Sequence, residues 1–182
     1  LHYNAKDVGA GPMGYIIENR ALRLALNRIV AADPKICWEP EVEVQSIERN
    51  SHRVSAELSN GIKVSAMLVV AADGKNSALR SGAGIKIIER AYHQTGIVCS
   101  VRHSFPHNAI AHERFLSAGP FAILPMIGNC SSLVWTERPD TAAAILNLGD
   151  TDFVEELSWR FGGFLGELEV ISPRWHYPLQ LL

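Results

Sequence analysis

An unbroken apolar run, AMLVVAA at residues 66–72, most constrains the fold of this chain, and it ends at Asp73 and Gly74. Strands that are apolar at successive positions are typical of parallel sheets, in which both faces are buried. The run from Met67 to Ala72 therefore predicts a core strand, with Asp73 at its carboxyl end. Ligands of open α/β sheets bind outside that end of the strands, where loops converge.

The residues that follow the predicted strand suit a small ligand. The short carboxylate of Asp73 can accept hydrogen bonds from ribose hydroxyls, and Gly74 permits close approach because glycine has no Cβ atom. Ser77 is expected to cap a short helix, and Arg80 either meets a phosphate or lies on the surface. The alternative is that Asp-Gly is only a favourable turn after a strand.

The segment before the run predicts a helix and a small antiparallel meander. Residues 1–14 are rich in Gly, Ala and Asn and are expected to form an irregular arm. From Asn19, a plausible N-cap, apolar residues recur at helical spacing until the sequence ADP at residues 32–34. Two stretches of alternating apolar and polar residues follow, and Asn60-Gly61 predicts a hairpin with a two-residue turn.

The second part of the chain predicts an antiparallel sheet and a helix. Short segments rich in aliphatic and aromatic residues lie at residues 96–101, 121–126 and 132–136. A helix is expected from Asp152 to about Leu168, with Asp152 and Glu155 as a capping box. The predicted fold class is therefore an incomplete α/β domain followed by an α+β domain.

Composition excludes several classes of protein. The net charge of −2 and the pI near 6.4 provide no basic field for a nucleic acid. Three separated cysteines without a CxxC pair argue against a disulfide framework and favour a reducing compartment. No segment approaches the roughly 20 apolar residues that span a bilayer, so no transmembrane segment is expected. Because the chain begins at Leu1 without an initiator methionine, we expect a piece of a longer protein.

The histidines do not form a pattern typical of a metal site. His93, His103, His107 and His112 lie in predicted strands and loops, and none belongs to an HExxH arrangement. Surface or hydrogen-bonded positions are expected for them, and no metal is predicted. The serines form no nucleophile elbow or triad, so hydrolysis has no support.

Several motifs, in order and at consistent spacing, resemble one known family. They are GYIIENRALRLAL, LVVAADGKNSALR, YHQTGIVCSV, HERFLSAGPFAILPM and SSLVWT, and the resemblance extends from Gly14 to Leu182. The family is that of the ubiquinone-biosynthesis hydroxylases, which are flavoprotein monooxygenases related to para-hydroxybenzoate hydroxylase. The resemblance implies FAD as prosthetic group, NAD(P)H as reductant, O2 as co-substrate and a polyprenylated phenol as substrate.

The resemblance also implies a division into domains and a cofactor site. Residues 1–84 correspond to a partial FAD-binding, Rossmann-like domain with a β-meander, and residues 85–182 to an antiparallel-sheet substrate-binding domain. The family's Asp-Gly motif lies along the flavin nucleotide, and here it matches Asp73, Gly74 and Ser77, with Arg80 beyond it. Asn19 stands where related hydroxylases place a polar residue near the cofactor, but an N-cap role explains it at least as well.

Two motifs of the family are missing from the sequence. One is the GxGxxG turn that holds the FAD pyrophosphate on a helix N-terminus, and the other is a later Gly-Asp motif that holds the ribityl chain. We therefore expect the middle of the enzyme, which alone binds FAD weakly or not at all.

The implied substrate domain offers candidates for an apolar pocket. Phe121, Leu124, Pro125 and Trp135 either line a pocket over the flavin ring or belong to the ordinary core. Arg114, in the sequence HERF, is expected to be structural, and the sequence identifies no catalytic residue.

Partners and location follow from the same resemblance. The implied partners are the polyprenyl phenol, O2 and other ubiquinone-biosynthesis proteins. The implied location is the cytoplasm and the periphery of the inner membrane. An alternative of a different class is a non-catalytic module for lipid binding or assembly, which keeps the flavoprotein fold without the flavin.

Overall fold

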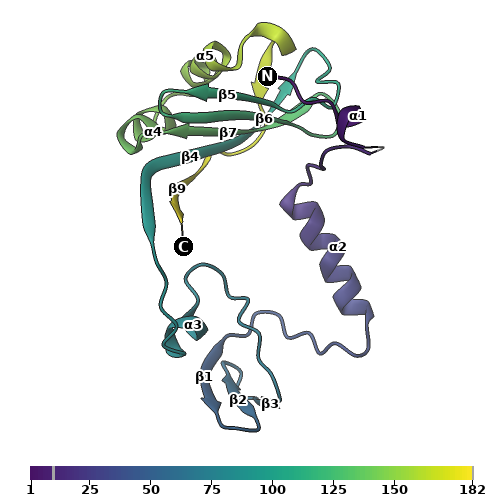
Figure 1. Cartoon of the computed structure of the whole chain (residues 1–182), viewed down its shortest axis with the longest axis vertical. Coiled ribbons are helices and arrows are strands. Elements are labelled where there is room, and N and C mark those ends of the chain that lie inside the picture. The colour runs from purple at the N-terminus through teal and green to yellow at the C-terminus, as the bar shows by residue number, and fades with distance from the viewer. Residues whose placement is uncertain (10, 182) are drawn as a thin grey trace. The chain divides into compact units, whose positions relative to one another are not determined.

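The computed structural model describes residues 1–9 and 11–181 (Figure 1). The chain forms two compact units. The first, Asn19–Ile87, is named the meander unit, and the second, Leu1–Glu18 with Ile88–Leu182, is named the sheet unit.

The meander unit contains the predicted antiparallel sheet. Its strands are β1 (Val44–Arg49), β2 (Val54–Leu58) and β3 (Lys63–Ala66), paired in the order β1-β2-β3. Helix α2 (Asn19–Ala32) precedes them, and the short helix α3 (Ala78–Gly82) follows them. The predicted helix and the predicted meander are both confirmed.

The loop of the hairpin between β2 and β3 is one residue longer than the sequence predicts. Leu58 N–H donates to the carbonyl of Ile62 at 2.9 Å, which leaves residues 59–61 as the loop. Gly61 takes the left-handed conformation with φ of 81°, and the Asn60 side chain accepts a hydrogen bond from Ile62 N–H. The prediction of a two-residue turn is therefore wrong, because Gly61 closes a three-residue loop.

The apolar run at residues 67–72 is not a strand, so the prediction of a core strand ending at Asp73 is wrong. Met67 and Val70 are 89% and 75% exposed. Pairing in this sheet ends where Ala66 meets Val54. A strand exists only with hydrogen-bonded neighbours, and no strand in the described ranges pairs with the run.

The sheet unit is built on an antiparallel sheet in the order β5-β6-β7-β4-β8, with β9 also paired to β4. The central strand β4 is long enough for β8 and β9 to pair with successive parts of one edge. The three predicted segments are confirmed as parts of β4, β6 and β7, whereas β8 and β9 were not predicted. The strand bounds are β4 Arg90–His103, β5 His112–Leu116, β6 Gly119–Pro125, β7 Cys130–Glu137, β8 Leu168–Val170 and β9 Trp175–Leu181.

The predicted second helix is shorter than expected. Helix α5 (Asp150–Phe161) ends where Gly162 adopts a φ of 82°, and a 3-10 turn, η1 (Gly163–Leu165), follows. Gly149 is the N-cap, so Asp152 lies in the first turn and the predicted capping box is wrong. Asp150 and Asp152 instead place negative charge at the positive end of the helix dipole.

Two further helices were not predicted. Helix α4 (Pro139–Leu146) begins with proline in its first turn, where the missing N–H costs no hydrogen bond. The arm contains a single helical turn, α1 (Ala5–Val8), whose N-cap Asn4 accepts a hydrogen bond from Lys6 N–H.

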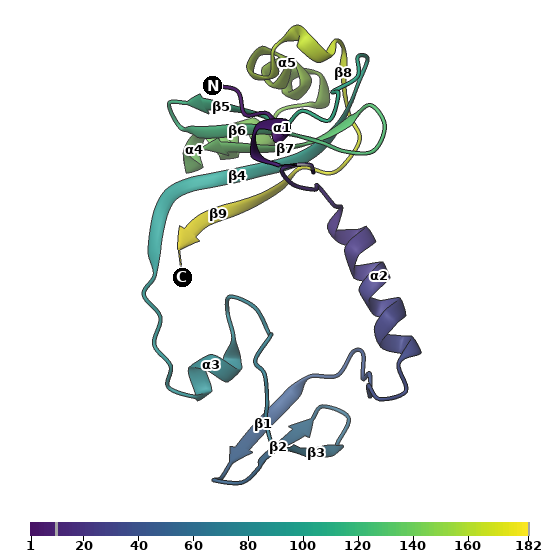
Figure 2. The same ribbon diagram turned by 45° about the vertical axis from the view of Figure 1, so that its right-hand side comes forward.

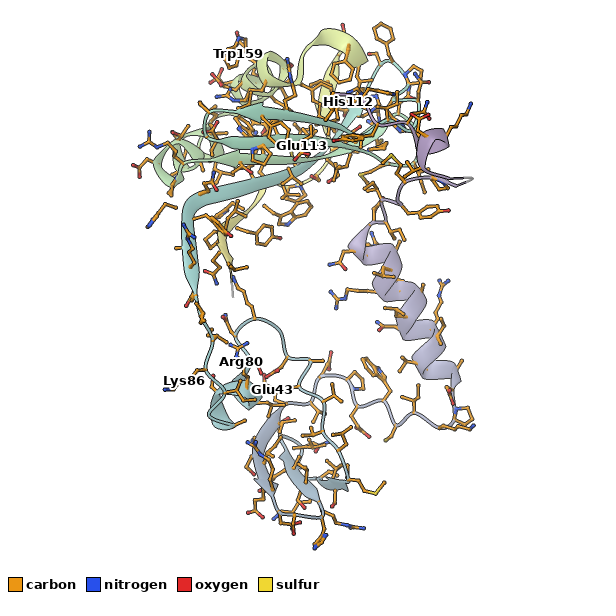
Figure 3. All side chains as sticks on the ribbon, viewed as in Figure 1. Glu43, Arg80, Lys86, His112, Glu113 and Trp159 are labelled. Atoms are coloured by element: carbon orange, nitrogen blue, oxygen red, sulfur yellow. The ribbon has the colours of Figure 1, made fainter. Side chains whose placement is uncertain are left out.

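Helices α4 and α5 cover one face of the sheet, as Figures 1 and 2 show. Phe121 of β6 and Trp135 of β7 lie on this face with ring centroids 5.9 Å apart. Phe153 and Phe161 of α5 pack on these two rings, whereas the exposed Trp159 points away from the sheet (Figure 3). The hydrophobic core of the sheet unit therefore lies between the sheet and these helices.

The opposite face of the sheet, named the open face, carries the alternate residues of each strand. Its centre is formed by Val98, Leu124 and Val134, which are partly buried. Trp175 and Tyr177 of β9 are paired with Val98 and Gly96, so they lie on the same face. No helix of the described part of this unit packs against the core from the open face.

Candidate functional site

The predicted Asp-Gly site folds as a tight loop that leads into α3. Ser77 is the N-cap of α3, as predicted, and its Oγ accepts a hydrogen bond from Arg80 N–H at 2.9 Å. Asp73 Oδ2 accepts a hydrogen bond from Leu79 N–H at 3.3 Å. The two side chains therefore satisfy two of the free N–H groups of the first helical turn.

Asp73 is held in its ionised form. Donation from the Ser77 hydroxyl lowers the pKa of Asp73 below its ordinary value of 3.8, and the backbone N–H of Leu79 acts in the same direction. Some loss of hydration acts in the opposite direction but is outweighed. The carboxylate is thus negative at neutral pH.

Gly74 has a conformational role in this loop. Its φ of 87° lies in the left-handed region, and a Cβ atom there would meet nothing within 4 Å. Glycine is therefore favoured by the backbone angle, while the free space beside it leaves room for a ligand.

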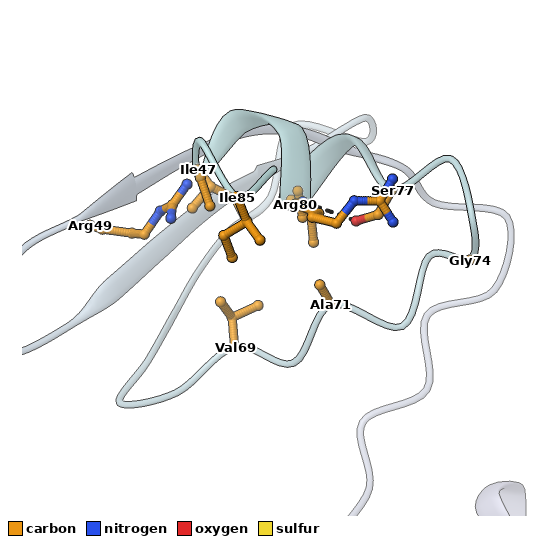
Figure 4. A pocket seen from close by; sticks show the side chains of 10 residues that line it. Ile47, Arg49, Val69, Ala71, Gly74, Ser77, Arg80 and Ile85 are labelled. Carbon is orange, nitrogen blue, oxygen red and sulfur yellow. Dashed lines mark hydrogen bonds between the residues drawn. The ribbon is translucent and has the colours of Figure 1, made fainter. Parts of the chain in front are cut away.

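A cavity of about 410 Å³ lies beside this loop (Figure 4). Ile47, Val69, Ala71 and Ile85 make part of its lining apolar. Gly74, Ser77 and Arg80 also line it, whereas Asp73 is not among the lining residues. Of the four site residues predicted around the Asp-Gly motif, the structure therefore places three at one cavity. The carboxylate of the fourth, Asp73, binds the start of α3 instead.

Two guanidinium groups belong to the cavity. Arg80 donates through Nη2 to the carbonyl of Lys75 at 2.7 Å, which ties its side chain across the Asp-Gly loop. Arg49 of β1 lines the same cavity. The remaining N–H donors of the two side chains can bind a phosphate or another anionic group.

Asn19 is not brought to this cavity. It is the first residue of α2 and is exposed, and it does not line the cavity. No hydrogen bond of its side chain is found among the described residues, so the predicted N-cap is not formed.

The four predicted pocket residues lie in two different environments. Phe121 and Trp135 are 0% and 1% exposed and lie in the core under α5. Leu124, which alternates with the core residue Ile123, lies on the open face, and Pro125 ends the same strand. The four residues therefore do not line one pocket.

Arg114 and the histidines have structural contacts. Arg114 donates to the carbonyl of Arg160 in the last turn of α5. His103 is buried and binds the carbonyl of Phe105 and the hydroxyl of Ser131, while His107 binds the carbonyl of Met126. Among residues 1–9 and 11–181, no three His, Cys, Asp or Glu side chains form a group that could hold a metal ion.

Sequence reasoning missed several residues of the cavity beside the Asp-Gly loop and of the open face of the sheet. Arg49 and Ile47 come from β1 and become neighbours of the Asp-Gly loop only through folding, so no local motif marks them. Trp175 and Tyr177 could have been found, because WHYPL alternates in the manner of a strand.

None of the helices in the part of the chain that the structure describes has the length and apolar character needed to cross a membrane.

Two curated relatives and one solved structure place the chain among known proteins. Ubiquinone hydroxylase UbiL of Rhodospirillum rubrum is 46% identical over 100% of this chain and 42% of its own length. The 3-demethoxyubiquinol 3-hydroxylase of Escherichia coli is 29% identical over 90% of this chain and 42% of its own length. The probable FAD-dependent monooxygenase pqsL of Pseudomonas aeruginosa matches with a TM-score of 0.62 at 19% identity, over 82% of this chain and 45% of its own.

No family model matches the chain. The solved structures share its fold, which confirms the predicted combination of α/β and antiparallel elements. The chain spans less than half the length of the curated relatives it matches. From its match to the ubiquinone hydroxylases over its whole length, the chain belongs to the ubiquinone hydroxylase family and corresponds to a part of such a protein.

Proposed function

We propose that the chain is the central part of an FAD-dependent monooxygenase that hydroxylates a polyprenylated phenol in ubiquinone biosynthesis, with NAD(P)H and O2. The observation that carries this proposal is the 46% identity to a ubiquinone hydroxylase over 100% of the chain. We assign residues 1–84 to the flavin-binding part and residues 85–182 to the substrate-binding part.

The residues of the Asp-Gly loop fit part of a flavin nucleotide. The open space at Gly74 admits a ligand, and the Arg49 and Arg80 guanidinium groups suit its phosphates. The ionised Asp73 organises the loop by binding Leu79 N–H and can also accept from a ribose hydroxyl. When bound, FAD supplies the redox and oxygen chemistry, so the protein is left with binding, orientation and exclusion of water.

The open face of the sheet suits the substrate. Its centre, formed by Val98, Leu124 and Val134, is apolar, and Trp175 and Tyr177 add aromatic surface beside it. Arg114 reaches toward α5, so it does not offer a cation at this face. A phenol with an apolar tail matches the open face better than a phenol that carries an acidic group.

The tail of such a substrate keeps it in a membrane. We therefore place the whole protein in the cytoplasm and at the periphery of the inner membrane. Other proteins of ubiquinone biosynthesis are proposed as partners because they hand on the same apolar intermediates.

The test is flavin content and activity of the whole natural protein. We expect a yellow protein that oxidises NAD(P)H and hydroxylates prenylated phenols, with KM falling as the tail lengthens. Each buried methylene contributes about 0.8 kcal/mol, close to fourfold in affinity. A colourless, inactive protein would favour the non-catalytic module, and a flat KM series together with a large loss for Arg114→Ala would contradict the substrate class.

A further inference from the structure

We propose that Gln94 is the residue that holds the ring hydroxyl of the phenol on the open face of the sheet. The assignment rests on the proposed function in one respect, namely that a phenol is the substrate bound there. Gln94 stands at the end of a bulge in β4, and its side-chain amide is held in one orientation.

The bulge occupies the stretch of β4 just before Thr95. Ala91 and Thr95 are four positions apart, but their partners in β9 are only two positions apart, so β4 carries two extra residues here. Within the bulge His93 has a φ of 53°, in the left-handed region that few residues other than glycine adopt. Bulges and strained backbone are frequent beside functional sites, where they direct a particular side chain. Gln94 is the last residue of this strained stretch.

The Gln94 side chain lies on the open face. Gly96, two positions further along β4, is paired with Thr136 of β7 and with Tyr177 of β9, and residues two apart in a strand share a face. A Cβ atom at Gly119 would lie 2.5 Å from Thr136 Cγ2 and 3.0 Å from Gln94 Nε2. The side chains of Gln94 and Thr136 therefore meet at Gly119 on this face.

The amide of Gln94 is fixed through its nitrogen atom. Nε2 donates a hydrogen bond to the carbonyl of Ala118 at 2.6 Å, in the turn between β5 and β6. Because a backbone carbonyl only accepts, this bond determines which end of the amide is the NH2 group. No described residue donates to Oε1, and no wholly buried side-chain oxygen of the described residues lacks a hydrogen bond, so Oε1 is accessible. The protein thus presents one acceptor in a set direction.

The apolar centre of the open face begins one residue pair away from this acceptor. Val98 and Val134 form the open-face pair that follows Gly96 and Thr136. Successive pairs on one face are about 7 Å apart along the strands, a span comparable with the length of a phenol. A phenol can therefore donate its hydroxyl proton to Gln94 Oε1 while its ring covers the two valines.

The chemistry of the acceptor selects a phenol. An amide oxygen accepts from a hydroxyl group, whereas a carboxylate only accepts and gains nothing from Oε1. The hydrogen bond draws the proton away from the ring oxygen, which raises electron density at the ring carbons ortho and para to it. It also fixes the direction of the ring, and such positioning lowers the barrier to reaction. Gln94 therefore binds, orients and activates the ring without a charge of its own.

The experiment compares binding of 2-prenylphenol and of its methyl ether to the whole natural protein loaded with FAD, by equilibrium dialysis without NAD(P)H. The ether cannot donate a hydrogen bond. We expect the wild type to bind the phenol about fivefold more tightly than the ether, as one neutral hydrogen bond predicts. Gln94→Met keeps the length of the side chain but removes the amide, so the two affinities should become equal.

A second variant and a control accompany this change. Gln94→Asn keeps an amide but withdraws the acceptor by one methylene, so it should also lose the preference for the phenol. Gln180→Met is the matched control, because Gln180 lies on β9 three positions from Tyr177 and therefore on the other face of the sheet. It should keep the wild-type ratio of affinities.

A wild-type ratio in both Gln94 variants would overturn the assignment, even with weaker binding of both compounds, because a purely structural role through Ala118 affects phenol and ether alike. A wild type that binds the two compounds equally would overturn it too. Hydroxylation of the phenol by the wild type separates these results from the proposed function. If the phenol is hydroxylated, only the role of Gln94 is wrong; if it is not, the proposed function is wrong and the role of Gln94 with it.

Discussion

Arg114 of β5 donates a hydrogen bond to the carbonyl of Arg160, which lies in the last turn of α5. The last carbonyl groups of a helix have no partner within the helix, so this contact joins the edge of the sheet to the end of α5. Arg114 therefore stabilises the covered side of the sheet unit.

We predict that Arg114→Ala lowers the free energy of unfolding by about 1 kcal/mol, because it removes a charge-assisted hydrogen bond at a partly exposed site. Chemical denaturation measures this loss. Arg102→Ala is the control, since Arg102 forms an exposed ion pair with Glu169 and its removal should change stability by less than about 0.5 kcal/mol. Equal losses for the two variants would show that the Arg160 contact adds nothing.

Gly74→Ala should open the Asp-Gly loop. Alanine at a φ of 87° costs roughly 1 kcal/mol, which corresponds to about fivefold faster hydrogen exchange at the amides of Leu79 and Arg80. Gly82→Ala is the matched control, because Gly82 ends α3 without a left-handed φ and has free space beside it. Unchanged exchange in Gly74→Ala would contradict the conformational role of Gly74.

Acid should loosen the same loop through Asp73. Its pKa is lowered in the folded state, so the stabilisation is complete above the ordinary value of 3.8 and is lost as pH falls through the lower folded value. An NMR titration of the Asp73 carboxyl group should give a value below 3.8. Asp73→Asn should remove this pH dependence from the exchange of the Leu79 amide.

Ser77→Ala should raise the pKa of Asp73 toward its ordinary value, because it removes the hydroxyl that contributes most to the shift. Ser81→Ala is the control: the Ser81 hydroxyl donates to the carbonyl of Ser77 and not to the carboxylate. A titration in which both variants behave alike would assign the shift to the helix terminus instead of the Ser77 hydroxyl.

The cysteines should differ in reactivity. Burial raises the pKa of Cys99 to about 11, whereas Cys37 is exposed. At pH 8 a thiol reagent should modify Cys37 rapidly in the folded chain and should reach Cys99 only after denaturation. Mass spectrometry of the labelled peptides measures both rates, and rapid labelling of Cys99 would contradict its place in the core.

The sequence predicted the elements that depend on local patterns. The meander follows from alternation, and the strands around Phe121 and Trp135 follow from short segments rich in aliphatic and aromatic residues. The cap at Ser77 follows from a serine before a helical segment. The end of α5 was not predicted, because the apolar spacing continues to Leu168, which lies on a different element.

Other features depend on contacts that no local pattern encodes. Residues 67–72 have the composition of a buried strand, but a strand also needs neighbours with which to pair. Phe121 and Leu124 were predicted together, either as lining of one pocket or as ordinary core, yet the alternation of β6 directs them to opposite faces. Arg49 reaches the cavity of the Asp-Gly loop only through the fold of the meander unit.

The exposed run after β3 also bears on the behaviour of the chain in concentrated solution. Residues 67–72 are uncharged, rich in valine and leucine, and directly follow an edge strand, which are the features of segments that nucleate amyloid-like assembly. A covering layer over this segment, from whatever source, would keep neighbouring molecules apart. Nascent chains that have emerged from the ribosome only as far as α3 should therefore be clients for chaperones.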